Sequence, residues 1–208
     1  MNTLAKPKEN LIDPLILIPI LLLTSISALF IFSASNVIAS ENFNNPFFFI
    51  ERQVVAFALS LIMFSVFLFI PISFYRENGL LLFFLSAILL ALVLIPGIGR
   101  EVNGSRRWLD LGFMNMQPSE VAKIFVPIYL CGYCLRRKEQ LESSWRGFLK
   151  PIVITSLISI LLFFEPDIGA MVVIFAIGIG ILFIGGAKLS QLGILTIIFV
   201  TLVSIFIY

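Results

Sequence analysis

The chain alternates long apolar segments with short polar ones. A membrane-spanning helix needs about 20 mostly apolar residues, and seven segments reach or approach that length. These are residues 14–35, 54–70, 80–95, 118–135, 148–164, 168–184 and 192–208. None of them shows the alternation of apolar and polar positions over about 10 residues that is typical of a membrane-spanning strand. The pattern therefore predicts an all-α polytopic membrane protein with about seven transmembrane helices.

The composition agrees with this prediction. Of the 208 residues, 60% are hydrophobic and 12% are charged, whereas a soluble domain averages about 45–50% and about 25%. So few charges cannot cover a water-exposed surface, which excludes an ordinary soluble enzyme, a nucleic-acid-binding protein and a disordered regulator. The apolar segments leave no room for a separate soluble domain. We expect residues 1–208 to form a single transmembrane domain, with a cytoplasmic tail at residues 1–13.

Lysine and arginine in the short loops indicate which side of the membrane each loop faces, because they are enriched on the cytoplasmic side. If the N-terminus is cytoplasmic, nine of these residues lie inside and four lie outside, and Lys123 falls within a segment. We therefore expect a cytoplasmic N-terminus. Arg100, Arg106 and Arg107 lie in the outer loop at residues 96–117, against this trend, which favours a functional reason for them.

The strongest local signal is the run Q-P-S-E-V-A-K at residues 117–123. Pro118 suits the first turn of a helix, and Glu120 lies near the positive end of the helix dipole. Glu120 and Lys123 are three residues apart, so they share a helix face and can pair. A charge within a membrane segment is costly and usually faces a bundle interior or a cavity. Two interpretations stay open: the pair only orients the helix, or Lys123 lines a cavity for an anionic substrate and Glu120 holds it.

The polar loop before this run is the second candidate. Asn103 and Gly104 form a turn dipeptide. Arg106 and Arg107 are able to bind phosphate through bidentate contacts, and Trp108 suits the membrane surface. The loop either binds phosphate or is an interfacial segment that touches lipid headgroups.

The third candidate is the short connection E-P-D-I-G-A at residues 165–170. Asp167 suits the N-cap of the following helix. Alternatively, Glu165 or Asp167 faces the same outer cavity as Lys123, because both helix ends lie on the outer side in this topology. Both interpretations stay open.

Other residue types limit the chemistry. The sequence has no histidine, and its two cysteines are Cys131 and Cys134. A zinc site needs about four ligands, so we expect no metal site and interpret both cysteines as packing residues without a disulfide. No cofactor is implied, and a requirement for a divalent cation stays open. The basic segment at residues 136–150 is expected to set the topology and to contact anionic lipid.

In this order, the motifs resemble those of the SEDS family (shape, elongation, division and sporulation), over nearly the whole chain. The resemblance rests on V-N-G-S-R-R-W-L-D-L-G at 102–112, Q-P-S-E-V-A-K at 117–123, E-P-D-I-G at 165–169 and L-F-I-G-G-A-K-L at 182–189. Three further runs are more similar to the division members of the family than to its elongation members. They are N-P-F-F-F at 45–49, R-G-F-L-K-P at 146–151 and G-A-K-L at 186–189.

The resemblance implies a peptidoglycan glycosyltransferase in the bacterial cytoplasmic membrane, at the division septum. Such proteins polymerise lipid II, an undecaprenyl-pyrophosphate-linked disaccharide peptide, into glycan strands. They work with a class B penicillin-binding protein and other division proteins. A lipid II flippase and a non-catalytic division scaffold stay open as alternatives. A pyrophosphate on a lipid tail requires cations beside a lipid-accessible cavity, and the implied substrate-binding residues are Arg106, Arg107, Gln117, Glu120, Lys123 and Asp167.

The chain also departs from the family pattern. Family members have further helices and a large outer loop after the seventh, and that loop carries the aspartate assigned as the general base. No catalytic residue is therefore assigned among these residues, and we expect an N-terminal portion of a longer protein that is inactive as a polymerase by itself. Asn115 stands where arginine is frequent, which slightly weakens the cationic site. Ala170 stands where threonine is common, and nothing in the sequence explains that change.

Overall fold

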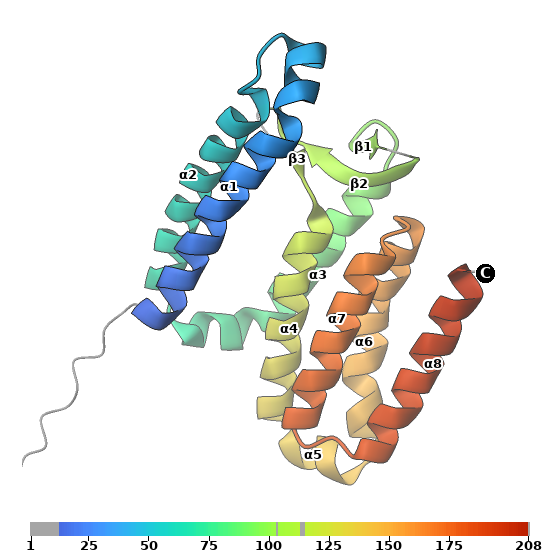
Figure 1. The fold of residues 1–208 in the computed structure, drawn as a ribbon. Coiled ribbons are helices and arrows are strands. Elements are labelled where there is room, and N and C mark those ends of the chain that lie inside the picture. Colours follow the sequence, from blue (N-terminus) through green and yellow to red (C-terminus); the bar gives the residue numbers. More distant parts are fainter. Residues whose placement is uncertain (1–12, 103, 113–114, 208) are drawn as a thin grey trace, which may run out of the picture. The chain divides into compact units, whose positions relative to one another are not determined.

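The computed structural model describes residues 13–102, 104–112 and 115–207 (Figure 1). Residues 1–12 of the predicted cytoplasmic tail and Asn103 of the turn dipeptide lie outside this part of the chain. The helices are α1 (Pro14–Phe43), α2 (Phe48–Phe69), α3 (Ile72–Leu94), α4 (Pro118–Arg136), α5 (Lys138–Ser143), α6 (Trp145–Phe164), α7 (Ile168–Ile184) and α8 (Leu189–Ile207). The strands are β1 (Gly99–Val102), β2 (Ser105–Asp110) and β3 (Asn115–Met116). The chain divides into two compact units, Met1–Pro71 and Ile72–Tyr208.

Each of the seven predicted segments corresponds to one long helix, and the short helix α5 adds to them within the described residues. By length and hydropathy, α1, α2, α3 and α6 are each able to cross a membrane, and α7 and α8 are shorter apolar helices. The structure therefore confirms an all-α polytopic membrane protein with about seven helices.

Several helices extend beyond the apolar segments that predicted them. Helix α3 begins at Ile72 and includes the polar stretch at residues 76–78, where the Asn78 side chain donates to the Phe74 carbonyl. Helix α1 continues to Phe43 and ends where Asn44 adopts the left-handed conformation, with φ of 53°. Hydropathy indicates the part of a helix that lies within the bilayer. Capping and side-chain hydrogen bonds decide where the helix begins and ends.

The first unit is a helical hairpin of α1 and α2. Asp13 caps α1, because its carboxylate accepts from the Leu15 backbone N–H at 2.9 Å, and Pro14 occupies the first turn. At the turn, the rings of Phe43 and Phe48 stack with centroids 3.8 Å apart. Most side chains along both helices are exposed and apolar, as expected for helices whose solvent is lipid.

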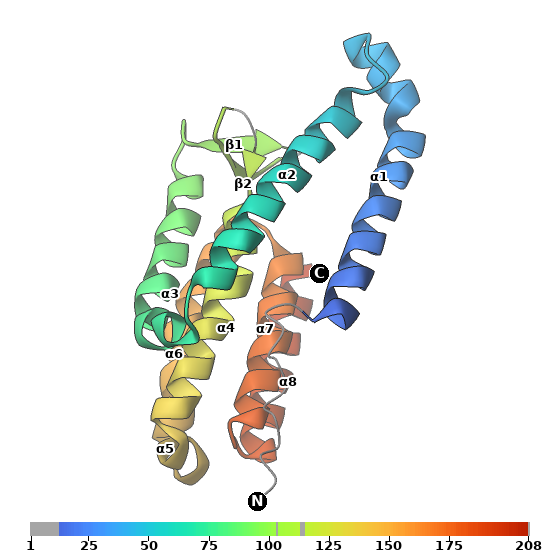
Figure 2. The same ribbon diagram turned by 90° about the vertical axis from the view of Figure 1, so that its left-hand side faces the viewer.

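In the second unit, α4 is the central helix and packs against α3, α6 and α7 (Figures 1 and 2). The core between these helices is one apolar cluster, and most of its side chains are fully buried. Its members are Phe83, Ala87, Leu90, Ala122, Val126, Tyr129, Leu130, Ile158, Leu162, Ala170 and Ile174. This core fixes the N-terminal ends of α4 and α7 beside each other, and those ends carry two of the predicted motifs.

The loop between α3 and α4 contains a small antiparallel sheet with strand order β1-β2-β3, where the sequence analysis expects only a loop. Gly104 has φ of 78° and stands in the turn between β1 and β2. Gly99 is also required, because a Cβ there would lie 1.8 Å from the Val93 carbonyl oxygen. The strands are short and carry charged residues, so the turn dipeptide is their only signal in the sequence.

Candidate functional site

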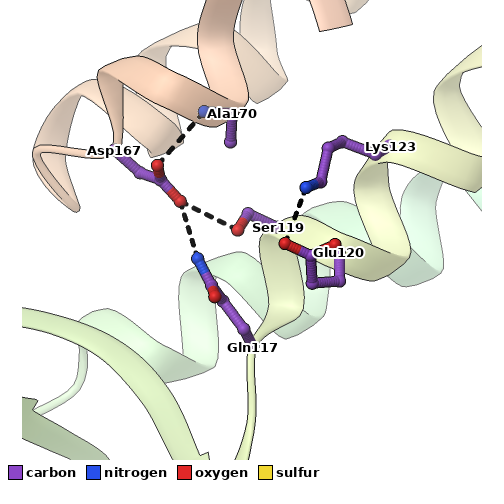
Figure 3. Close-up of polar contacts among 6 residues, drawn as sticks. All are labelled: Gln117, Ser119, Glu120, Lys123, Asp167 and Ala170. Carbon is purple, nitrogen blue, oxygen red and sulfur yellow. Dashed lines mark hydrogen bonds and ion pairs between the residues drawn. The ribbon is translucent and has the colours of Figure 1, made fainter. Parts of the chain in front are cut away.

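Asp167 connects the two motifs at the N-terminal ends of α4 and α7 (Figure 3). Its Oδ2 accepts from Gln117 Nε2 and from Ser119 Oγ, each at 2.9 Å. Its Oδ1 accepts from the Ala170 backbone N–H at 3.1 Å, which caps α7. Asp167 is 6% exposed and Ser119 is fully buried. The N-cap interpretation of Asp167 is therefore confirmed, and the same carboxylate also holds the start of α4.

Glu120 and Lys123 form a separate contact on α4 (Figure 3). Lys123 Nζ lies 2.6 Å from Glu120 Oε1, as the spacing predicts. The Lys123 side chain is 25% exposed and the Glu120 side chain is 60% exposed. Lys123 is thus a partly accessible cation. Its one ion-pair partner in the described chain, Glu120, is exposed.

The two adjacent arginines of β2 have different contacts. Arg107 donates from Nε to the Glu165 carbonyl oxygen at 3.1 Å and from Nη2 to the Pro166 carbonyl oxygen. Arg106 pairs with Glu101 across the β1–β2 hairpin, with Nε 3.3 Å from the carboxylate. Successive side chains of a strand point to opposite faces, so the structure does not place these two guanidinium groups as one phosphate clamp. Arg107 instead holds β2 on the α6–α7 turn.

The environment of Glu165 is not predictable from the sequence. The residue is fully buried, and neither carboxylate oxygen has a hydrogen-bond partner among the described residues. Burial first, and then the charge of Asp167, raise the pKa of Glu165 to about 8, while Arg107 opposes the shift. The group is therefore mainly protonated at neutral pH. Nothing in the E-P-D motif by itself distinguishes this buried acid from the capping Asp167.

A cavity of about 270 Å³ lies between α4, α6, α7 and α8. Its lining is apolar except for the hydroxyls of Thr155, Ser156 and Ser159. None of the predicted substrate-binding residues lines it. All three hydroxyls lie inside the apolar helix α6, and nothing in its sequence indicates a cavity.

The described residues contain no group of three or more histidine, cysteine or acidic residues placed to hold a metal ion. Cys131 is exposed and Cys134 is buried, and both are free thiols. Asn115, one of the departures from the family pattern, accepts from Arg100 Nη1 through its Oδ1 at 3.5 Å. Three of the predicted motifs thus meet where β2, α4 and the α6–α7 turn come together.

Three comparisons with known proteins agree with the motifs. The model of the FtsW, RodA and SpoVE family of cell cycle proteins matches residues 13–208. A probable peptidoglycan glycosyltransferase FtsW of Marinomonas mediterranea is 45% identical over 159 residues, which cover 76% of this chain and 39% of that protein. The probable peptidoglycan glycosyltransferase FtsW of Pseudomonas fluorescens is 38% identical over 185 residues, with coverage of 89% and 46%. The chain thus spans less than half the length of these two relatives.

Solved structures show the same fold. The rod shape determining protein RodA of Thermus thermophilus matches with a TM-score of 0.64 at 27% identity, over 86% of this chain and 58% of that chain. A chain from a study of how a peptidoglycan synthase complex coordinates polymerization and crosslinking matches with the same TM-score and identity, over 86% and 52%. The helices, the ordered motifs and these matches lead to one conclusion. The chain is a multi-pass bacterial membrane protein that belongs to the FtsW, RodA and SpoVE family and is FtsW-like within it.

Proposed function

We propose that this chain contributes to a peptidoglycan glycosyltransferase that polymerises lipid II for the division septum. The names of the FtsW relatives support this activity. The observation that carries the proposal is the Asp167 network, which joins the Q-P-S-E and E-P-D motifs at one end of the second unit. This network fixes the first turn of α4, which carries Glu120, and Lys123 follows three residues later on the second turn.

In this proposal Lys123 is the cation that contacts the substrate pyrophosphate. Its side chain is partly exposed, and its ammonium group lies 2.6 Å from Glu120 Oε1. An ammonium group acts as a compact charge that phosphate oxygens attract from any direction. Glu120 keeps the Lys123 side chain oriented before the substrate binds. In the complex, the Lys123 ammonium group contacts both Glu120 and the substrate phosphate.

The other candidates have supporting roles. Gln117 and Asp167 position the start of α4, because their hydrogen bond spans the two motifs. Arg107 positions β2 through the backbone of the α6–α7 turn. Arg106, whose side chain is 39% exposed, has Glu101 as its neutralising partner and is the weaker second cation for the substrate.

We infer that the N-terminus is cytoplasmic, so that the N-terminal ends of α4 and α7, with the Asp167 network, lie on the outer side of the membrane.

A class B penicillin-binding protein and other division proteins are the proposed partners. The match to a chain of a peptidoglycan synthase complex supports the first of these. No cofactor and no nucleic acid are part of the proposal. Residues 1–208 are proposed to bind lipid II and, as the resemblance implies, not to polymerise it by themselves.

The test is lipid II binding by the purified 208-residue chain in nanodiscs. Lys123→Ala should weaken binding about 10-fold or more, because charge-assisted hydrogen bonds contribute about 1.5–3 kcal/mol. Lys188→Ala, which removes the same charge beyond the other end of α7, is the matched control and should leave affinity unchanged. Unfolding temperatures of both variants exclude a general loss of structure.

Each competing function has its own signature. Absence of lipid II binding by the wild-type chain would indicate a scaffold and overturn the proposal. Lipid II movement across vesicle membranes without polymer would indicate a flippase. Glycan polymer made by the 208-residue chain would contradict the expected inactivity, while leaving the substrate assignment in place.

A further inference from the structure

Positive charge gathers at the end of the second unit that lies away from the Asp167 network. Here the C-terminal end of α4, the short helix α5 and the N-terminal ends of α6 and α8 lie together (Figure 1). Residues 136–150 together with Lys188 carry six cations and two carboxylates. The cations are Arg136, Arg137, Lys138, Arg146, Lys150 and Lys188.

This end is a packed scaffold. An apolar cluster that includes Leu141, Phe148, Leu182 and Leu192 joins α5 to α6, α7 and α8. Tyr133 Oη donates to the Gly147 carbonyl oxygen at 2.7 Å and so ties α4 to α6. The cations therefore project from fixed backbone positions.

Most of these cations have no hydrogen-bond or ion-pair partner among the described residues. Lys138 lies 3.8 Å from Glu142, and Arg136 donates to the Arg76 carbonyl oxygen at 2.9 Å. Arg146 and Lys150, in contrast, are exposed and have no carboxylate within ion-pair distance in the described chain. Their charge is available to an outside ligand.

The start of α6 combines these two cations with apolar side chains on one outward face. Trp145 is 49% exposed and Leu149 is 47% exposed. These two apolar residues are four positions apart, and so are Arg146 and Lys150, so each pair occupies successive turns on the same side of the helix. The apolar face continues along the helix through further exposed side chains. These are Val153, Leu157, Ile160 and Phe164.

That continuous apolar face identifies the surroundings. Helix α6 is long and apolar enough to cross a membrane, and its exposed apolar stripe suits contact with lipid acyl chains. Residues at its first two turns then lie at the level of the lipid headgroups, where tryptophan and basic residues are favoured. A ligand at this depth that neutralises two cations is an anionic lipid headgroup.

We propose that the first two turns of α6 form a binding site for an anionic phospholipid. Arg146 and Lys150 contact the headgroup phosphate, and Trp145 and Leu149 lie against the upper part of the acyl chains. A zwitterionic lipid binds less well, because its own ammonium group offsets the phosphate charge.

The experiment titrates the purified 208-residue chain in detergent with phosphatidylglycerol or with phosphatidylcholine of identical acyl chains, followed by native mass spectrometry. Each cation near an anionic lipid changes affinity about five-fold. The wild-type chain should therefore prefer phosphatidylglycerol about 25-fold, and the double variant Arg146→Gln/Lys150→Gln should lose that preference. Arg52→Gln/Arg100→Gln removes the same charge elsewhere and should retain it.

A second readout locates the lipid. Phosphatidylglycerol with brominated acyl chains should quench the fluorescence of Trp145, and Trp145→Phe should remove that part of the quenching and leave only the signal of Trp108. Equal binding of the two lipids by the wild-type chain, or equal loss in both double variants, would overturn the proposal. Complete competition by glycerol 1-phosphate would also overturn it, because the site would then take soluble phosphate rather than a lipid.

Discussion

The buried carboxylic acid of Glu165 gives a prediction with a definite sign. Its pKa is raised to about 8 in the folded chain, against 4.5 for an ordinary glutamate. Between these two values the folded state holds a proton that the unfolded state has released. The free energy of unfolding must therefore fall as the pH rises from about 4.5 to about 8, and this loss is absent below that window.

The magnitude follows from the shift. One pKa unit corresponds to about 1.4 kcal/mol, so at pH 7 ionisation stabilises the unfolded state of the wild-type chain by about 3 kcal/mol. Glu165→Gln has nearly the same shape and never ionises, so it escapes this loss. The variant should match the wild type near pH 4 and exceed its stability by about 3 kcal/mol at pH 7.

The assay is thermal unfolding of the purified chain in detergent between pH 4 and pH 8.5, followed by the fluorescence of its two tryptophans. For a chain of this size, about 3 kcal/mol corresponds to roughly 6–12 °C in the unfolding midpoint. Glu139→Gln, which changes an exposed carboxylate, is the matched control and should follow the wild-type profile. Parallel profiles for the wild type and Glu165→Gln would refute the reasoning.

Two further predictions concern packing and hydrogen bonding. Asp167→Ala should destabilise the chain by about 3–5 kcal/mol, because it leaves the fully buried Ser119 and the half-buried Gln117 without an acceptor and removes the cap of α7. Asp167→Asn keeps one acceptor oxygen and should cost less in the same unfolding assay, so equal losses would contradict the hydrogen-bond account. Gly147→Ala should destabilise by about 1–3 kcal/mol or more, since its Cβ would lie 2.0 Å from the Gln140 carbonyl oxygen. Gly180→Ala, where a Cβ meets nothing within 4 Å, should be neutral or stabilising by up to about 1 kcal/mol, and a similar loss in both variants would disprove the steric argument.

Much of the fold follows from the sequence because the signals for it are local. An apolar stretch predicts a membrane helix wherever it occurs, so all seven long helices were predictable. The Glu120–Lys123 pair was predictable for the same reason, since both residues lie on one turn of one helix. The strands β1, β2 and β3 were not predictable, because they are short and charged and lack the alternation of apolar and polar residues that indicates a strand.

The candidate site was only partly predictable. The motifs identified Asp167 as an N-cap, but not the hydrogen bonds that it accepts from Gln117 and Ser119 on another helix. The pattern also suggested that Arg106 and Arg107 act alike, whereas one pairs with Glu101 and the other binds backbone carbonyls of the α6–α7 turn. Residue type gives the charge of a side chain, but not the direction in which a strand presents it.

The sequence by itself determined that this protein is a helical membrane protein, since apolar length and the scarcity of charge depend on no distant contact. It also determined the order of the motifs, and hence the family resemblance. Only the tertiary structure decided that Gln117 donates a hydrogen bond to Asp167, fifty positions away in the sequence. It also decided that the Glu165 side chain is fully buried. The physical reason is that burial and hydrogen bonding at helix ends depend on which ends meet, and the packing of α4 against α3, α6 and α7 sets that arrangement.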